Sequence, residues 1–392
     1  MSAFRQITLV TAMGLRTVPQ RPGRASVVVI GIAGVVGVLV SMLTLGVSIV
    51  ESTRAAGKED RAIVLRNGMD KEPESAIFTA EAQTIADAPG VARTADGKPA
   101  ATAELLATVN VPRKLDGALA GVMVRGISPQ AAAVRPEIVL KEGRMFTPGL
   151  RELVVGRILQ EGFKGLKIGD RVRLPDGEWT VVGVYETGDM WESMLLTDVT
   201  TLMSSYHRNV FSSVTVRLVS PAAFAQFKDA LSSDPTLSVN VMRESDFYSK
   251  GSELSAVFII LSYVIGAIMA AGALFGALNT MYSSVSARSV EIATLRAIGF
   301  PGASVVVSVL VEAMLLAMIG GLVGAAISWA LLSGGTFALG APGGSAVAAK
   351  LHVTPQLVGI GFVWALVMGL FGGLLPALRA ARLPVATALR AS

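Results

Sequence analysis

The side chains whose types and spacing could do chemistry gather in one short stretch, Ser283–Ser304. Arg288, Glu291 and Arg296 stand at positions i, i+3 and i+8, so a helix would place the first two on adjoining turns, where opposite charges attract. This chemistry is ion pairing and docking rather than catalysis. The stretch lies between two long apolar runs, and it has the composition of a short docking helix.

The rest of the chain offers no reactive constellation. Its two histidines, His207 and His352, are far apart and lack partner ligands, and it contains no cysteine. The sequence therefore gives no support to a metal site, a disulfide or a nucleophilic enzyme. The segment Gly334–Lys350 is rich in glycine but lacks Gly-Lys-Ser/Thr in register, so it does not match a phosphate-binding loop. We expect a non-enzymatic chain with no cofactor of its own.

The composition is that of a membrane protein. Of the 392 residues, 52% are apolar and only 16% are charged, whereas soluble domains are about a quarter charged. Apolar runs long enough to span a bilayer occur at Ser26–Val50, Leu254–Tyr282, Val305–Leu332 and Leu357–Leu375. The first run is longer than the apolar core of a signal peptide, so we expect it to be a retained anchor.

The positive charges near the ends of these runs predict the topology. They are Arg5, Arg16, Arg21, Arg24, Arg288, Arg296, Arg379, Arg382 and Arg390. Glu291 is the only acid among them. Positive residues near span ends stay in the cytoplasm, so both termini are predicted to lie inside and the large segment after the first span outside. Because the arginines are dispersed, the high isoelectric point is not a sign of nucleic-acid binding.

This topology divides the chain into four parts. Residues 1–24 are predicted to form a cytoplasmic amphipathic helix on the inner leaflet, and residues 25–50 the first transmembrane helix. Residues 51–253 are large enough for an α+β extracytoplasmic domain. Residues 254–392 are predicted to form a membrane domain with three further transmembrane helices and a cytoplasmic coupling helix at 283–304. The predicted fold is thus four transmembrane helices with a large domain inserted between the first and second.

Two helices are expected in the outer domain. One begins at Thr79, which can cap it, and the other at Ser220-Pro221. A short apolar run follows each helix, and this faint repeat suggests two related βαβ-like units. Helical extensions of the adjoining spans are expected at Glu51–Asp60 and Met242–Glu253.

The region between the two helices is rich in strand patterns. They lie at Val122–Ile127, Glu137–Leu140, Leu153–Val155, Val172–Leu174 and Trp179–Tyr185. The turn signal Pro175-Asp176-Gly177 joins the last two as a hairpin.

The third apolar run carries the remaining candidate residues. Glu312 lies about two turns inside it, where a bare carboxylate is costly, so it should pair with a cytoplasmic arginine such as Arg296 or reach the interface. Gly320, Gly321 and Gly324 would let helices approach closely. Since the four runs lack pore-lining polarity, we expect no substrate path through the bilayer.

Several of these residues carry a resemblance to a known family. The pattern Arg-x-x-Glu-Ile-x-x-Leu-Arg-Ala-x-Gly, a following span with an early glutamate and small residues, and a C-terminal Leu-Leu-Pro-Ala-Leu-Arg resemble the FtsX/MacB permeases. These are the type VII, or mechanotransmission, ABC transporters. The matching residues here are Arg288, Glu291, Ile292, Leu295, Arg296, Ala297, Gly299, Glu312, Gly320, Gly321, Gly324, Pro376 and Arg379. Glu142-Gly143-Arg144, Gly169-Asp170 and Val182-Gly183 resemble the external domain of the same family.

The resemblance implies a permease subunit in the bacterial inner membrane. It assigns coupling to an ATPase to Arg288, Glu291, Ile292, Leu295, Arg296 and Gly299. No ATPase precedes the first span, so a separate cytoplasmic ABC ATPase would hold ATP and magnesium. Further implied partners are a second permease chain, membrane lipid and a periplasmic adaptor protein. In that family, ATP-driven motion drives efflux, lipoprotein handling or control of cell-wall hydrolases.

Two other interpretations stay open on the residues alone. The charged stretch could be a solvated interfacial helix whose arginines serve only as positive-inside anchors. The whole chain could be a membrane-anchored sensor or scaffold that regulates envelope proteins.

Overall fold

The computed structural model describes residues 11–12, 22–339 and 347–382. The amphipathic helix expected at 1–24 therefore lies almost wholly outside the described residues. The chain forms two compact units. The membrane unit takes in residues 1–46, 257–335 and 352–392, and the outer unit takes in residues 47–256 and 336–351.

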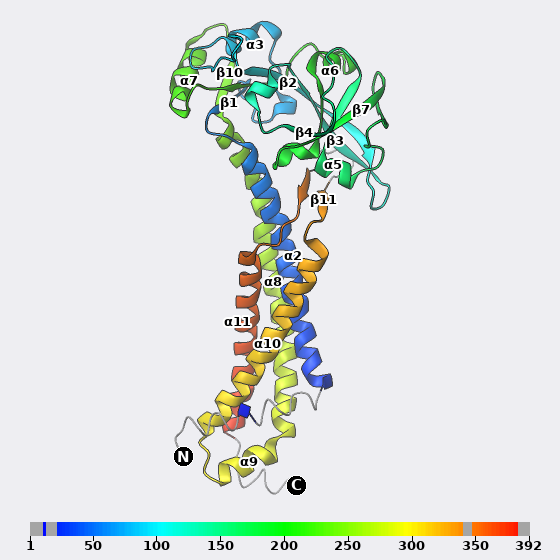
Figure 1. The fold of residues 1–392 in the computed structure, drawn as a ribbon. Helices are drawn as coiled ribbons and strands as arrows, with labels where there is room; N and C mark the ends of the chain where they lie inside the picture. The colour runs from blue at the N-terminus through cyan, green and yellow to red at the C-terminus, as the bar shows by residue number, and fades with distance from the viewer. Residues whose placement is uncertain (1–10, 13–21, 340–346, 383–392) are drawn as a thin grey trace. The chain divides into compact units, whose positions relative to one another are not determined.

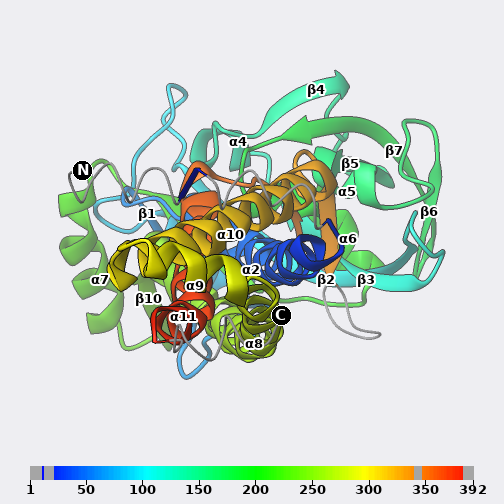
Figure 2. The same cartoon turned by 90° about the horizontal axis from the view of Figure 1, so that it is seen from below.

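Four helices of the described chain are long and apolar enough to cross a membrane, as the sequence predicts. They are α2 (Pro22–Ala56), α8 (Glu244–Ala287), α10 (Gly302–Leu332) and α11 (Pro355–Ala381). Figures 1 and 2 show their membrane-unit portions side by side. A short helix, α9 (Ser289–Ala297), connects α8 to α10. The span of α8 is the least covered, with 11% of its most apolar window buried.

Glycines bring α10 into backbone contact with its neighbours. A Cβ atom added at Gly324 would lie 2.5 Å from the carbonyl oxygen of Ala33 on α2. One added at Gly321 would lie 2.8 Å from the Cβ atom of Ala365 on α11. Van der Waals packing is the main attraction between helices in lipid, and missing side chains allow the closest approach. These glycines therefore set the spacing of α2, α10 and α11.

The first half of the outer unit contains two interleaved βαβ units. One consists of β1 (Arg61–Arg66), α3 (Thr79–Ala86) and β2 (Ala101–Pro112), and the other of β9 (Ser213–Arg217), α7 (Phe224–Ser233) and β10 (Val239–Arg243). The strands pair antiparallel in the order β10-β1-β9-β2. This is a split βαβ arrangement, so the repeat suggested by the sequence is confirmed.

The second half continues the same sheet. Its strands are β3 (Leu119–Ile127), β4 (Val139–Gly143), β5 (Glu152–Gly156), β6 (Arg171–Leu174), β7 (Gly177–Glu186) and β8 (Met194–Asp198). Its helices are α4 (Ala131–Val134), α5 (Arg157–Gly162) and α6 (Val199–Ser205), with the 3-10 turn η3 (Met190–Ser193) before β8. The order is β2-β3-β8-β5-β7-β4, and β6 pairs with β7 in the predicted hairpin.

Strand β2 belongs to both halves. Its residues 101–104 pair with β9, and its residues 105–112 pair with β3. Separate apolar cores lie on either side of this change of partner, one around Phe227 and Ile85 and the other around Trp179 and Phe163. The two halves are thus joined through one continuous strand.

Some boundaries differ from those predicted. Thr79 is the first residue of α3 rather than its cap, because the carboxylate of Glu81 accepts a hydrogen bond of 2.8 Å from the backbone N–H of Phe78. Helix α2 ends at Ala56, short of residue 60. A Cβ atom at Gly57 would lie 2.7 Å from the Cα atom of Ser245, so the chain leaves α2 where it contacts the start of α8.

Two short strands were also not expected. Residues Thr336–Leu339 form β11 and Val347–Lys350 form β12, within the glycine-rich segment Gly334–Lys350. They pair antiparallel with each other.

Replacing Gly324 with alanine should destabilise the membrane unit by about 1–3 kcal/mol, because the new methyl group overlaps the backbone of α2. Thermal unfolding in detergent measures the effect. Gly359→Ala in α11 is the matched control, since no atom lies within 4 Å of its added Cβ. Equal melting temperatures for the two variants would show that the α2–α10 contact does not depend on Gly324.

Candidate functional site

The predicted coupling segment folds as a helix with sharp ends. Helix α8 continues to Ala287, and α9 ends with Ile298 as its C-cap. Gly299 has φ +100, the backbone N–H of Gly299 bonds to the carbonyl of Arg296 at 3.1 Å, and that of Phe300 bonds to Leu295 at 3.1 Å. This is the Schellman pattern, which favours glycine because its backbone is left-handed. Gly299 therefore ends α9 and lets α10 begin at Gly302.

One face of α9 is covered by the membrane unit itself. Ile292 and Ala293 are buried, and Ile292 packs in a cluster with Met281, Val285 and Val305 of α8 and α10. Leu295 and Arg296 are half-buried. The side chain of Ile292 is therefore turned toward the chain's own core rather than toward a free surface.

The opposite face of α9 carries the exposed apolar side chains. Val290 is 40% exposed and Ile298 is 71% exposed, with Thr294 between them at helical spacing. Glu291 lies on the surface beside Val290. The sequence-based assignment included Glu291 but missed Val290 and Ile298. Their spacing of eight residues was the available signal, because it places both on one side of a helix.

Arg288 connects α9 to α10. Its Nε donates a hydrogen bond of 3.0 Å to Glu291, and its Nη1 lies 3.4 Å from a carboxylate oxygen of Glu312. The side chains of Arg288 and Glu312 are 15% and 12% exposed. The structure thus gives the carboxylate of Glu312 a partner in Arg288, across the corner between the two helices.

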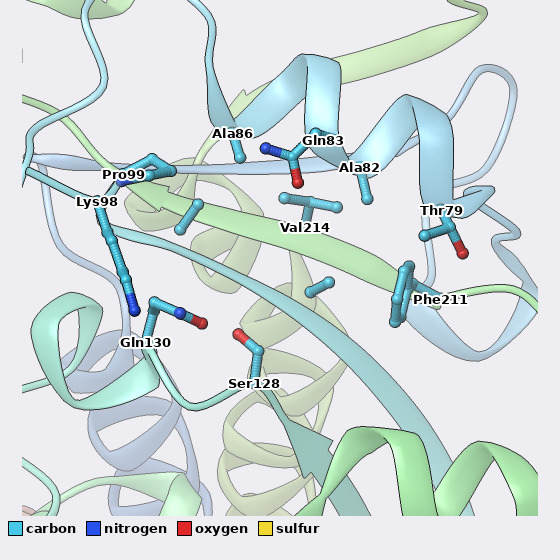
Figure 3. A pocket seen from close by; sticks show the side chains of 12 residues that line it. Thr79, Ala82, Gln83, Ala86, Lys98, Pro99, Ser128, Gln130, Phe211 and Val214 are labelled. Carbon is cyan, nitrogen blue, oxygen red and sulfur yellow. The ribbon is translucent and has the colours of Figure 1, made fainter.

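Described residues of the outer unit form a cavity. It has a volume of about 350 Å³ and lies beside α3 and strands β2 and β9. Figure 3 shows Gln83, Lys98, Ser128 and Gln130 around it, with Phe211 and Val214 among its apolar walls. The lining contains no carboxylate, histidine or tyrosine, so it lacks a general acid–base pair. Among the described residues, no group of acidic or histidine side chains has the arrangement of a metal site.

Replacing Arg288 with glutamine should destabilise the membrane unit by about 1–3 kcal/mol, because it leaves the mostly buried carboxylate of Glu312 without this partner. A double-mutant cycle with Glu312→Gln, measured by thermal unfolding, checks the coupling. Glu291→Gln is the control, since its side chain is 56% exposed and should change stability little. Additive effects of the Arg288 and Glu312 substitutions would show that the two groups do not interact.

Comparison with known protein families covers most of the chain. Residues 25–234 match the model of the MacB-like periplasmic core domain, and residues 263–385 match that of the FtsX-like permease C-terminal domain. A protein of Bacillus subtilis strain 168, described as an uncharacterized ABC transporter permease, YknZ, is 29% identical over 145 residues. That match covers 35% of this chain and spans about a third, 33%, of the length of the relative.

Two solved structures are each similar to about half of the chain. The extracellular domain of the noncanonic ABC-type transporter YknZ from Gram-positive bacteria is 16% identical, with a TM-score of 0.35, over 46% of this chain and 99% of that one. The periplasmic region of MacB from Actinobacillus actinomycetemcomitans is 17% identical, with a TM-score of 0.38, over 52% of this chain and 97% of that one. The assignment of the chain to a family rests on the two family matches, which follow one another along the sequence. The chain is a multi-pass membrane protein that belongs to the FtsX/MacB family of ABC transporter permeases.

Proposed function

We propose that this chain is the permease subunit that transmits ATP-driven motion from a separate cytoplasmic ATPase to its own outer unit, and so drives export or lipoprotein handling. The observation that carries the proposal is the exposed side of α9. Val290 and Ile298 are apolar and exposed on a connection between two spans, where lipid does not cover them if α9 lies at the cytoplasmic surface. Exposed apolar side chains beside a charge are typical of a protein–protein contact.

The contacts of α9 support a mechanical role. The buried side of the helix is fixed through Ile292 in the cluster with α8 and α10, and Arg288 joins it to Glu312. A partner bound to the free side would therefore pull on both helices together. On this proposal, Val290, Glu291 and Ile298 contact the ATPase, and Ile292, Arg288 and Gly299 hold α9 in place.

The positive charges near the span ends support an orientation with both termini in the cytoplasm of a bacterial inner membrane. In this orientation α9 faces the ATPase, and the cavity beside α3 lies outside. ATP and magnesium would bind to the ATPase, and this chain would perform no hydrolysis. A periplasmic adaptor would meet the outer unit.

A second permease chain is also part of the proposal. Gly272 and Gly276 of α8 have no atom within 4 Å of an added Cβ, and Ile268 and Phe275 beside them are 68% and 73% exposed. Small residues four apart let two membrane helices approach closely. We infer that this face of α8 contacts the same face of another permease, in a complex of two permeases and two ATPases.

Replacing Ile298 with aspartate should abolish co-purification of ATP-hydrolysing activity with the tagged chain. Truncating or charging an anchor at the centre of an interface typically costs at least about 2 kcal/mol of association. Val219→Asp is the matched control, because Val219 is similarly exposed, at 68%, but lies in the outer unit. If the aspartate variant co-purified with as much ATP-hydrolysing activity as the parent, Ile298 would not be a docking residue. The helix α9 would then be only an interfacial anchor.

Replacing Gly276 with leucine should reduce the mass of the detergent-extracted complex from two permeases to one, because the larger side chain separates the helices. Gly359→Leu is the control, since Gly359 is equally open in the structure but lies on α11. Native mass measurement reads the result directly. A parent complex that contains a single permease would contradict the proposed pair.

A further inference from the structure

Seven charged side chains meet in the interior of the outer unit. They are Arg61, Glu72, Glu104, Arg125, Arg135, Glu137 and Glu244. Six of them have side chains no more than 5% exposed, and Glu137 is 20% exposed. We refer to these seven residues as the charge cluster. It is large for a domain interior, where ionic groups are rarely buried.

Glu244, the first residue of α8, is the member of the charge cluster that joins three other segments. Its Oε1 accepts a hydrogen bond from Arg135, which follows α4 in the second half of the sheet. Its Oε2 lies 3.5 Å from Arg61 at the start of β1 in the first half. The same oxygen accepts a hydrogen bond of 3.2 Å from the backbone N–H of Lys58, just after α2. One fully buried carboxylate therefore contacts both halves and the segment that leaves α2.

Trp191 of η3 extends these contacts across the unit. The guanidinium carbons of Arg135 and Arg125 lie 3.8 Å and 4.3 Å from its ring centroid, within the range of cation–π attraction. Its Nε1 donates a hydrogen bond of 3.1 Å to the hydroxyl of Tyr248, which is also on α8. The first turns of α8 thus contact Trp191 directly through Tyr248 and indirectly through Arg135.

Arg125 lies at the point where the partner of β2 changes from β9 to β3. It pairs with Glu104, the last residue of β2 that pairs with β9, and it makes two hydrogen bonds, of 2.9 Å and 2.8 Å, to Glu72. Although burial opposes ionisation, Arg125 lowers the pKa of Glu72, whereas burial raises the pKa of Glu104 in spite of Arg125. The charge cluster therefore crosses from one half of the sheet to the other.

Stability alone does not account for so many buried charges. Well-packed apolar side chains often replace a buried ion pair with no loss of stability, whereas removing one partner leaves the other uncompensated. Ionic contacts add a defined geometry, because the N–H groups of a guanidinium point in fixed directions and bind carboxylates only there. A cluster placed where α8, α2 and the two halves converge fixes their mutual register.

We propose that Glu244 is the positioning residue that holds the first turn of α8 to both halves of the outer sheet, so that displacement of α8 moves the two halves as one body. The inference rests on the proposed transmission of motion, and it names the contact through which motion enters the outer unit. The ion-pair partners of Glu244 are Arg61 in the first half and Arg135 in the second half.

The charge cluster contains a substitute for Glu244. Besides Glu244, Arg135 lies 4.0 Å from carboxylate oxygens of both Glu104 and Glu137, and its Nη1 makes no hydrogen bond. Loss of the Glu244 charge would let Arg135 turn to these neighbours. The variant Glu244→Gln should therefore fold, with the charge cluster present and α8 released from it.

The absence of cysteine allows spin labels to be placed without background. Cysteines at three exposed positions, Lys250 on α8, Lys228 on α7 and Arg173 on β6, give two label pairs that join α8 to each half. Electron–electron distance measurements on the full chain in nanodiscs read each pair. We expect narrow distributions in the parent and broad ones for both pairs in Glu244→Gln.

Glu137→Gln is the matched control. It removes another carboxylate from the same cluster, one that pairs with Arg61 at 2.6 Å, but Glu137 is not part of α8. A purely structural role for the charge cluster predicts the same broadening in both variants, whereas the proposal predicts it only in Glu244→Gln. Distributions as narrow as the parent's in Glu244→Gln, or equal broadening in the control, would overturn the inference.

Hydrogen exchange of the same proteins gives a second readout that does not depend on labels. Protection of the amides in the first turns of α8 should fall about tenfold or more in Glu244→Gln, because the contact that resists local opening is lost. Protection within β5 and β9 should stay at the parent level. A loss of protection in those strands as well would mean that Glu244 supports the whole fold rather than the position of α8.

These measurements need no ATPase and no transported substrate. A negative result would therefore remove Glu244 as the positioning residue and leave the permease assignment untouched. Failure of the ATPase to bind through α9 would instead leave the label distances unchanged, so the two ideas can fail separately.

Discussion

Close backbone contact between helices is the constraint on which the membrane unit depends. Lipid offers no hydrophobic driving force between helices, so their attraction comes from van der Waals contact over short distances. Gly324 gives α10 that contact with α2, and Gly321 gives it contact with α11. In the same unit, the buried residue Ile292 of α9 packs in one cluster with residues of α8, α10 and α11, so the position of α9 depends on the spacing of these helices.

The sequence predicted the features that depend on local pattern. Four apolar runs gave the four helices, and Pro175-Asp176-Gly177 gave the hairpin of β6 and β7. The faint repeat gave the two βαβ units, although not their interleaving, since pairing between β1 and β9 joins segments about 150 residues apart and leaves no local mark. The charge cluster was missed for the same reason. Arg61, Arg125 and Glu244 look like ordinary surface residues until the sheet brings them together.

In α9, the family pattern does not include the large apolar residues that are exposed. The family pattern selects Ile292 and Gly299, but the structure places Ile292 in a core and Gly299 at a helix end that needs a left-handed backbone. Such residues specify how α9 is held. The exposed residues Val290 and Ile298 belong to no motif, so they emerge only when the other face of α9 is known to be covered.

The interleaving of the two βαβ units has a consequence for synthesis. Strand β1 emerges early, but its partners β9 and β10 are completed only at Arg217 and Arg243. The strands from β3 to β8 lie within residues 119–198. They can pair before β9 and β10 of the first half have been synthesised. Domains of growing chains fold as their segments become available. The second half of the outer unit should therefore assemble before the first half. Glu244 follows β10 directly, so its contacts can form only after the last strand of the ten-stranded sheet has been made.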